Sequence, residues 1–322
     1  MKFGRALLAS AAITLSLAVA GAAAAQEKFP SKNIEVILHA SPGGGTDITA
    51  RMMMAGTAKI LGQDMVPVYK RGGGAKAAHE YFKSRPADGH TIMALTQTHL
   101  YQIAQNDSPI EIDDIVGVAR AMDDPTFLVV RKDSPYKTIE ELVEASKEKA
   151  LNWGVGQIGS TEHIGLARFA EAAGIQYKVI PFGSGGPMVN ALMSGSIDGT
   201  IPNVSEAKSQ IEDGTFIPLV VLDDKRLEDF PDVPTSFEKG YEVKVTTTRG
   251  YAVRKGTPPE QIKILEEAML EGMNTEEFKK YLSSLGLSPR TSVAGAEEWD
   301  AQLKEEYAQA AEILQKMDMV KQ

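Results

Sequence analysis

The chain contains no cysteine among its 322 residues. This absence excludes disulfide bonds, thiolate metal sites, a cysteine nucleophile and a lipid attached through cysteine. Basic residues are also fewer than acidic ones, 34 Lys and Arg against 43 Asp and Glu, which gives a formal net charge of −9. Because contacts to phosphate need clustered Lys and Arg, nucleic acid is not expected as a partner.

Long apolar runs are absent after the first 25 residues, so no transmembrane helix is expected in the remaining chain. At the N-terminus, Lys2 and Arg5 precede the uncharged run 6–25, which ends in Ala23-Ala24-Ala25. A short basic segment, an apolar segment and an A-x-A site are typical of a secretory signal peptide. We therefore expect residues 1–25 to be removed on export, leaving roughly 300 residues, enough for two lobes.

Strand-like and helix-like segments alternate along the rest of the chain. Strands are expected at 34–38, 66–69, 91–95, 127–131, 151–154, 176–180, 197–201 and 243–248. Helices are expected at 48–61, 75–84, 139–150, 161–173, 188–193, 258–273 and 294–317. This alternation predicts an α/β fold in which helices cover both faces of parallel sheets. The last two helices are expected to have a structural role.

Two glycine-rich segments follow strand-like runs and lead into helix-like runs. The first is Ser41-Pro42-Gly43-Gly44-Gly45-Thr46-Asp47, and the second is Gly154-Val155-Gly156-Gln157-Ile158-Gly159-Ser160-Thr161. A glycine turn between a strand and a helix exposes backbone N–H groups beside the positive end of the helix dipole. One such loop in each half of the chain indicates a ligand held between two lobes. For the second loop, a purely structural turn remains an alternative.

The second segment also matches G-x-G-x-x-G, the fingerprint of a dinucleotide site. Such a site needs an acidic residue at the end of the next strand to bind the ribose hydroxyls. Here the strand-like run 177–180 ends in Pro181-Phe182, without a carboxylate. We therefore expect neither a nucleotide nor any other cofactor.

Three charged or titratable side chains near these segments are candidates for ligand contact. Asp47 is expected to cap the first helix and to pair with Arg51 four residues later, although it could also hold a bridging water or a ligand donor group. His39 ends the first strand beside the loop and could touch the ligand. Arg249 follows the strand-like run 243–248, where its guanidinium could bind a carboxylate through two hydrogen bonds, with a surface arginine as the alternative.

Ser160 and His163 raise the alternative of an exported hydrolase. The sequence around Ser160 lacks the G-x-S-x-G elbow, and a serine at a helix start usually caps the helix or binds an oxyanion. The five histidines include no H-E-x-x-H or similar ligand pair, so a metal centre is not expected. Accordingly, we predict no catalytic residues.

A series of short motifs occurs in a characteristic order and spacing. The series comprises Phe29-Pro30-Ser31-Lys32, Gly43-Gly44-Gly45-Thr46-Asp47, Arg71-Gly72-Gly73-Gly74, Pro86-Ala87-Asp88-Gly89-His90-Thr91, Gly156-x-x-Gly159-Ser160-Thr161-x-His163, Pro181-Phe182-Gly183-Ser184-Gly185, Gly195-Ser196-Ile197-Asp198 and Phe230-Pro231-Asp232-Val233-Pro234-Thr235. Nearly end to end, the chain thereby resembles the extracytoplasmic solute-binding component of tripartite tricarboxylate transporters, the Bug/TctC family.

The resemblance implies a two-lobed, periplasmic-binding-protein-like fold that closes on a small di- or tricarboxylate-like organic acid. Each lobe would be a mostly parallel sheet flanked by helices, with residues 26–124 and 240–322 in lobe I and 125–239 in lobe II. The implied partners are the membrane subunits of a tripartite tricarboxylate-type transporter. A monomeric, periplasmic protein without a lipid anchor is expected. A subunit that presents ligand to a signalling receptor is an alternative that the sequence does not separate from transport.

The resemblance places the ligand against the two glycine loops and the ends of two further strands. Together with His39 and Arg249, the expected ligand residues are Ser41, Gly43, Gly44, Gly45, Thr46, Asp47, Thr96, Gln97, Gly156, Gln157, Ile158, Gly159, Ser160, Thr161, His163 and Asn203. The chain departs from the family where V-P-F-x-A-G-G is replaced by Leu38-His39-Ala40-Ser41-Pro42-Gly43-Gly44, and where Thr248-Arg249 replaces an aromatic pair. Both departures predict an additional acidic group on the ligand.

Overall fold

The computed structural model describes residues 28–40, 42–43, 45–73, 75–183 and 185–321. The expected signal peptide, residues 1–25, and the expected ligand residues Ser41 and Gly44 lie outside the described residues. Within these ranges, no helix is long and apolar enough to cross a membrane.

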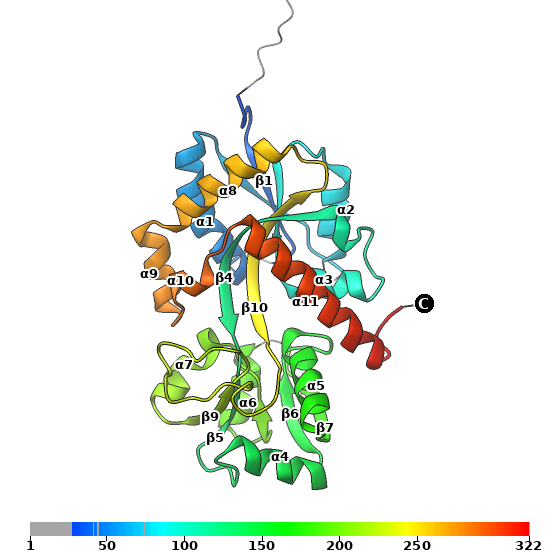
Figure 1. Ribbon diagram of the computed structural model, residues 1–322, viewed down its shortest axis with the longest axis vertical. Coiled ribbons are helices and arrows are strands. Elements are labelled where there is room, and N and C mark those ends of the chain that lie inside the picture. Colours follow the sequence, from blue (N-terminus) through cyan, green and yellow to red (C-terminus); the bar gives the residue numbers. More distant parts are fainter. Residues whose placement is uncertain (1–27, 41, 44, 74, 184, 322) are drawn as a thin grey trace, which may run out of the picture.

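The chain forms two five-stranded sheets, one in each half of an elongated molecule (Figure 1). The first has the order β2 (Met65–Tyr69), β1 (Ile34–Leu38), β3 (Thr91–Leu95), β10 (Thr246–Arg254) and β4 (Ile115–Pro125). The second has the order β7 (Tyr177–Pro181), β6 (Leu151–Val155), β8 (Gly199–Thr200), β5 (Phe127–Arg131) and β9 (Phe216–Val221). Each sheet is mostly parallel, because only β10 and β5 run antiparallel to their neighbours.

Helices flank both sheets, as the alternating sequence pattern predicts. We call the first sheet and its helices lobe I, and the second sheet and its helices lobe II. Lobe I carries α1 (Gly45–Leu61), α2 (Lys76–Ser84), α3 (Gln97–Ala104), η1 (Ile112–Asp114), α8 (Pro259–Met273), α9 (Glu276–Ser284), α10 (Pro289–Ser292) and α11 (Ala296–Lys316). Lobe II carries α4 (Ile139–Glu148), α5 (Thr161–Ala173), α6 (Gly185–Met193) and α7 (Val204–Glu212). The exact lobe boundaries at 124/125 and 239/240 stay a prediction.

The sheet of lobe I buries both of its faces. Because side chains alternate along a strand, Val36 and Leu38 of β1 pack toward α1 and α8, whereas Ile37 packs toward α2, α3 and α11. We call these two sides the α1 face and the α3 face. Side chains at the strand ends are neighbours only when they lie on the same one of these two faces.

Strands β4 and β10 form a long antiparallel ribbon that extends between the lobes (Figure 1). Its register runs from Thr246 opposite Pro125 to Arg254 opposite Ile115, with two irregularities. At its lobe II end, Thr126 donates its N–H to the carbonyl of Val245 and accepts the N–H of Leu222 on its own carbonyl. Both lobes are therefore tied to the same two strands.

The strand expected at 243–248 is shifted in the structure to Thr246–Arg254. Val243 and Val245 instead pack into the apolar core of lobe II, which ends the segment before β10 begins. Strand β4 is not expected from the sequence, because Gly117, Arg120 and two aspartates interrupt its apolar pattern. Helices α3, α7 and α9 are likewise additions to the expected elements.

Candidate functional site

The carboxyl ends of the parallel strands in both lobes lie near the β4–β10 ribbon. Leu95 at the end of β3 pairs with Gly250 of β10, and Asn203 beyond β8 bridges to Thr126. In an open α/β sheet, ligands bind at this edge of the strands, where the following helices begin. The helices that begin after the strands near the ribbon are α1, α3, α5, α6 and α7.

The ribbon presents two different sets of polar side chains on its two faces. On the α1 face, Nη1 of Arg249 contacts Sδ of Met122, and Oγ1 of Thr247 donates to Oδ1 of Asn203 at 3.1 Å. On the α3 face, Thr246 bonds to Asp123, and Oγ1 of Thr248 accepts from Nε2 of Gln97. Asp124, one residue beyond Asp123, therefore lies on the α1 face with Arg249.

Arg249 reaches from the ribbon to the first glycine loop. A methyl group on Gly45, at the start of α1, would lie 2.9 Å from Nη2 of Arg249, so the guanidinium would have to shift to make room for it. The Nε atom of Arg249 is buried and has no partner among the described residues. Within the described ranges its guanidinium pairs with no carboxylate, which separates Arg249 from an ordinary surface arginine.

Two carboxylates face the same region, one from the end of β4 and one from α7 of lobe II. Asp124 accepts both the N–H and the hydroxyl of Ser205, and Glu206 accepts the N–H of Asn203 at 3.3 Å, so both carboxylates surround the N-terminus of α7. Burial raises the pKa of Asp124 to about 6 and that of Glu206 to about 7. The pKa of Glu206 is raised further by the charges of Glu162 and Asp124 and is opposed by Arg249.

These raised pKa values predict that Glu206→Gln stabilises the ligand-free protein in alkaline solution. The pKa of Glu206 rises from 4.5 to about 7 on folding, so the native state is disfavoured as pH increases through this window. The amide has no such penalty. Chemical unfolding should show a gain of about 1–3 kcal/mol for Glu206→Gln at pH 8 that largely disappears at pH 4.5. The exposed Glu212 of the same helix supplies the control, Glu212→Gln, and an equal gain there would contradict the assignment.

Asp47 is expected to cap the first helix; in the structure it lies inside the first turn of α1, and its carboxylate holds the loop before the helix. Oδ2 of Asp47 accepts the N–H of Gly43 at 2.8 Å, and the carboxylate also accepts from Arg51 at 3.1 Å and from Tyr69 at 2.7 Å. Burial alone would raise the pKa of Asp47, but these hydrogen bonds lower it below its usual value. The expected pairing with Arg51 is confirmed. Asp47 thus serves to hold the loop, and its acceptor sites are largely used within the protein.

His39 belongs to a chain of buried imidazoles on the α3 face. Nδ1 of His39 lies 3.0 Å from Nε2 of His99, whose Nδ1 lies 2.8 Å from Nε2 of His79, and Nδ1 of His79 lies 2.9 Å from the hydroxyl of Ser108. Burial lowers the pKa of His39 and of His79 to about 4, so both rings are neutral at physiological pH. No local pattern in the sequence indicates this arrangement, because its members come from separate elements.

The orientation of this chain follows from Ser108. Its hydroxyl donates to the carbonyl of Ile110 at 2.9 Å, so it accepts from Nδ1–H of His79. A neutral imidazole has one donor and one acceptor, so each ring in turn must donate from Nδ1. His39 is left with an acceptor, not a donor, at Nε2. The expected role of His39 toward the ligand stays a prediction.

The second glycine loop leads into α5 through Ser160, whose Oγ caps the helix by accepting the N–H of His163 at 3.4 Å. The hydroxyl of Ser160 donates to Glu162, and Nδ1 of His163 accepts the N–H of Gly159 at 2.9 Å. The two side chains therefore do not form a nucleophile–base pair. Ile158 at the tip of the loop is 56% exposed, which leaves it available to a ligand or to lobe I.

The remaining expected residues divide between the two faces. Thr96 follows the pair Leu95–Gly250 and so lies opposite Arg249 on the α1 face, where its buried Oγ1 has no partner among the described residues. Gln97 lies on the α3 face, where its side chain donates to Thr248 and, at 3.0 Å, to Glu306. The expected ligand residues are thus not a single cluster. As a binding site they stay a prediction.

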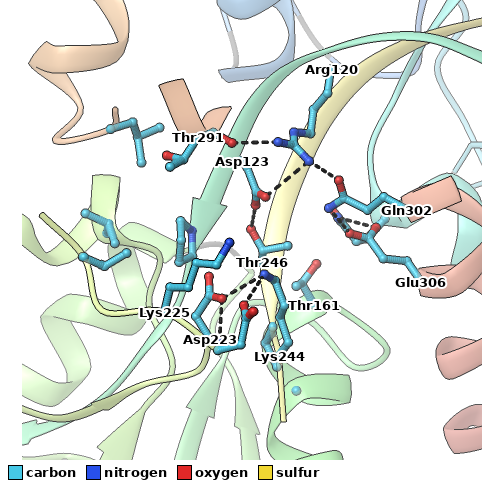
Figure 2. A pocket seen from close by; sticks show the side chains of 18 of the residues that line it. Arg120, Asp123, Thr161, Asp223, Lys225, Lys244, Thr246, Thr291, Gln302 and Glu306 are labelled. Carbon is cyan, nitrogen blue, oxygen red and sulfur yellow. Dashed lines mark hydrogen bonds and ion pairs between the residues drawn. The ribbon is translucent and has the colours of Figure 1, made fainter. Parts of the chain in front are cut away.

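A cavity of about 910 Å³ lies between the lobes beside the edge strand β4, and its lining runs from α3, α5 and α11 round to the segment 283–291 (Figure 2). Its wall includes Arg120, Asp123, Asp223, Lys244 and Glu306, and of the expected ligand residues it includes Gln97 and Thr161. Its charges are largely paired within the protein: Lys244 with Asp223 at 2.8 Å, and Arg120 with Glu298 at 3.1 Å. Arg249 and Gly45 are not among its lining residues, so this cavity is not the space in front of Arg249.

No group of His, Asp or Glu arranged to hold a metal ion occurs among the described residues. On the α1 face, the polar groups that the described part of the chain leaves for a ligand are an arginine, buried carboxylates and helix N-termini. This set can bind a small charged molecule. Two lobes on a shared ribbon, with such a set between them, define the class of extracytoplasmic solute-binding proteins.

The chain belongs to the tripartite tricarboxylate transporter family receptors, TctC, whose family model matches residues 49–319. It is 29% identical over 285 residues to a UPF0065 protein of Bordetella pertussis, covering 86% of this chain and 87% of that protein. The crystal structure of a TctC solute-binding protein from Polaromonas superposes with a TM-score of 0.82 at 28% identity, covering 89% and 99% of the two chains. This class is not enzymatic, so the hydrolase alternative is wrong.

A third similar protein shows the same fold at lower identity. MatC from Rhodopseudomonas palustris, solved with bound malate, superposes with a TM-score of 0.70 at 24% identity, covering 89% of this chain and 100% of that one. The two-lobed α/β fold and the family membership expected from the sequence are therefore confirmed.

Proposed function

We propose that the protein captures a small organic acid between its two lobes outside the cytoplasm and delivers it to a tripartite tricarboxylate-type membrane transporter. The observation that carries this proposal is Arg249, which lies against Gly45 and pairs with no carboxylate among the described residues. The guanidinium is partly buried, and its buried Nε has no partner among the described residues, so a carboxylate ligand would supply the missing acceptor.

The glycine loops support the same ligand chemistry. The start of α1 at Gly45 and the start of α5 at Thr161 bring backbone N–H groups and the positive ends of two helix dipoles to the strand ends. Closure of the lobes would remove water from these groups and strengthen each charge-assisted bond. MatC, which shares the fold, was solved with malate, a dicarboxylate. Family membership supports the transporter as partner and the periplasm as location.

Ligand capture predicts a rise in the unfolding temperature with organic acids. A ligand that binds the folded protein alone stabilises it by about 2.7 kcal/mol at a concentration of 100 times its Kd. Thermal unfolding should be recorded with millimolar succinate, malate, citrate, glutarate, adipate and their amino derivatives. Succinamide is the control, because it has the size of succinate without its charge. If none of these acids shifts the transition, the proposed function is wrong.

A further inference from the structure

We propose that the ligand carries a positively charged nitrogen as well as a carboxylate, and that Asp124 and Glu206 bind this nitrogen while Arg249 binds the carboxylate. The inference rests on the proposed function, since it assigns the chemical class of ligand at that same site. An amino acid with a free ammonium group, rather than a simple dicarboxylate, is the ligand class that fits.

The first step is that the described residues supply no cation partner for the two carboxylates. Asp124 is 1% exposed, and its described hydrogen-bond donors are the N–H and hydroxyl of Ser205. Glu206, which is partly buried, accepts the N–H of Asn203 and lies against Gly185 at the start of α6. Arg249 influences both electrostatically but forms an ion pair with neither within the described ranges. Buried carboxylates are strongly unfavourable unless a cation or several donors compensate for the lost hydration.

The second step is the separation of the charges within the site. The guanidinium of Arg249 contacts the thioether of Met122, a weak acceptor, although two carboxylates are nearby. Ser205 and Asn203 hold the carboxylates at the N-terminus of α7, and β10 holds Arg249 against α1. A positive end and a negative end therefore remain apart, each able to accept the opposite charge of a ligand.

An independent observation comes from Thr96, on the neighbouring strand. Thr96 is 8% exposed, and its Oγ1 is buried without a partner among the described residues. The register places it opposite Arg249, so both side chains lie on the α1 face. A buried hydroxyl without a partner indicates a group that completes its hydrogen bonds on ligand binding. This position is consistent with a ligand carboxylate that contacts Thr96 and Arg249 together.

The charge balance then separates the ligand classes. Asp124, Glu206, Glu162 and Arg249 sum to two negative charges when ionised, and the N-termini of α1 and α7 contribute about half a positive charge each. A dicarboxylate would add two further negative charges to a group that is already negative. A ligand with an ammonium group in place of one carboxylate, or with an ammonium group beside two carboxylates, reduces this repulsion. Its ammonium group also supplies a cationic partner for Asp124 and Glu206.

Matched pairs of probes test the inference by isothermal titration calorimetry at pH 8. The pairs are succinate and L-aspartate, glutarate and L-glutamate, butyrate and 4-aminobutyrate, and propionate and β-alanine. In the pair that binds best, the amino member should bind at least about tenfold tighter. Tighter or equal binding of the member without nitrogen overturns the inference and leaves the proposed function intact. If no member of any pair binds, the proposed function falls as well.

Substitutions locate the nitrogen. Asp124→Asn and Glu206→Gln should each reduce the preference for the amino member by about tenfold while affecting its partner much less. Asp123→Asn is the matched control, because Asp123 precedes Asp124 on β4 but bonds to Thr246 and lines the cavity. An unchanged preference in both Asp124→Asn and Glu206→Gln, with normal unfolding curves, overturns the assignment.

Discussion

Arg249→Ala is expected to weaken binding of the best organic acid about a hundredfold. Its guanidinium lies at the start of α1 without a carboxylate partner among the described residues, and a charge-assisted bidentate contact in such a partly buried place contributes about 2–3 kcal/mol. The change also leaves the carboxylates of Asp124 and Glu206 without a nearby positive charge, which adds repulsion toward any anion. Calorimetric titration of the variant and the unchanged protein measures the loss directly.

Two further variants separate a direct contact from a general disturbance of the strand. Arg254→Ala removes an arginine at the far end of β10, where its guanidinium bonds to the carbonyl of Arg85, and should leave affinity unchanged. Gly45→Ala places a methyl group 2.9 Å from Nη2 of Arg249 and should weaken binding by displacing the guanidinium. In the double variant Gly45→Ala/Arg249→Ala, the methyl group should add little to the loss. Additive losses would mean that the two residues act separately.

The sequence predicts those parts of the site that depend on neighbours in the chain. A strand, a glycine turn and a helix start occur within about ten residues, so the loop before α1 and the loop before α5 can be found directly. The pairing of Asp47 with Arg51 is equally local, because residues four apart lie on one helix face. The cap that Ser160 forms on α5 follows from the same short-range rules.

The charged set between the lobes depends instead on which distant strands pair. Asp124, Glu206 and Arg249 come from β4, α7 and β10, and in the sequence Asp124 marks only a crossing between lobes. Without the register of β4 and β10, the sequence does not show which of their side chains lie on the same face of the ribbon. Sequence patterns therefore assign Gln97 and Arg249 to one site, although the two residues lie on opposite faces. The signal that could have helped is the pair of acidic residues at the end of β4.

The histidine chain illustrates the same limit. His39, His79 and His99 lie on separate elements, and their spacing matches no ligand motif, so the sequence indicates three unrelated residues. The structure joins them because β1, α2 and α3 meet on the α3 face. The hydrogen bonds between the rings then set the tautomer of each one. The tautomer therefore depends on the whole chain of contacts and not on any single histidine.

Trp299→Ala is expected to destabilise the protein by about 3–5 kcal/mol, the largest loss of stability that we predict. The indole is fully buried, donates from Nε1 to the carbonyl of Tyr251 at 3.2 Å, and packs directly against the glycines at 117 and 250 of the ribbon. Removing it leaves a large cavity beside backbone that no neighbouring side chain can fill. Trp299→Phe keeps most of the apolar volume and should lose only about 1–2 kcal/mol.

Ligand binding should survive this change, because Trp299 lies on the α3 face and Arg249 on the α1 face. The same organic acid should therefore stabilise Trp299→Ala and the unchanged protein by equal amounts at a given ligand concentration. Urea unfolding with and without ligand measures both quantities in one experiment. A loss below about 1 kcal/mol would contradict the packing role of Trp299. If the ligand stabilised Trp299→Ala less than the unchanged protein, a change on the α3 face would alter binding on the α1 face. Helix α11 would then contribute to ligand binding through the strands on which it packs.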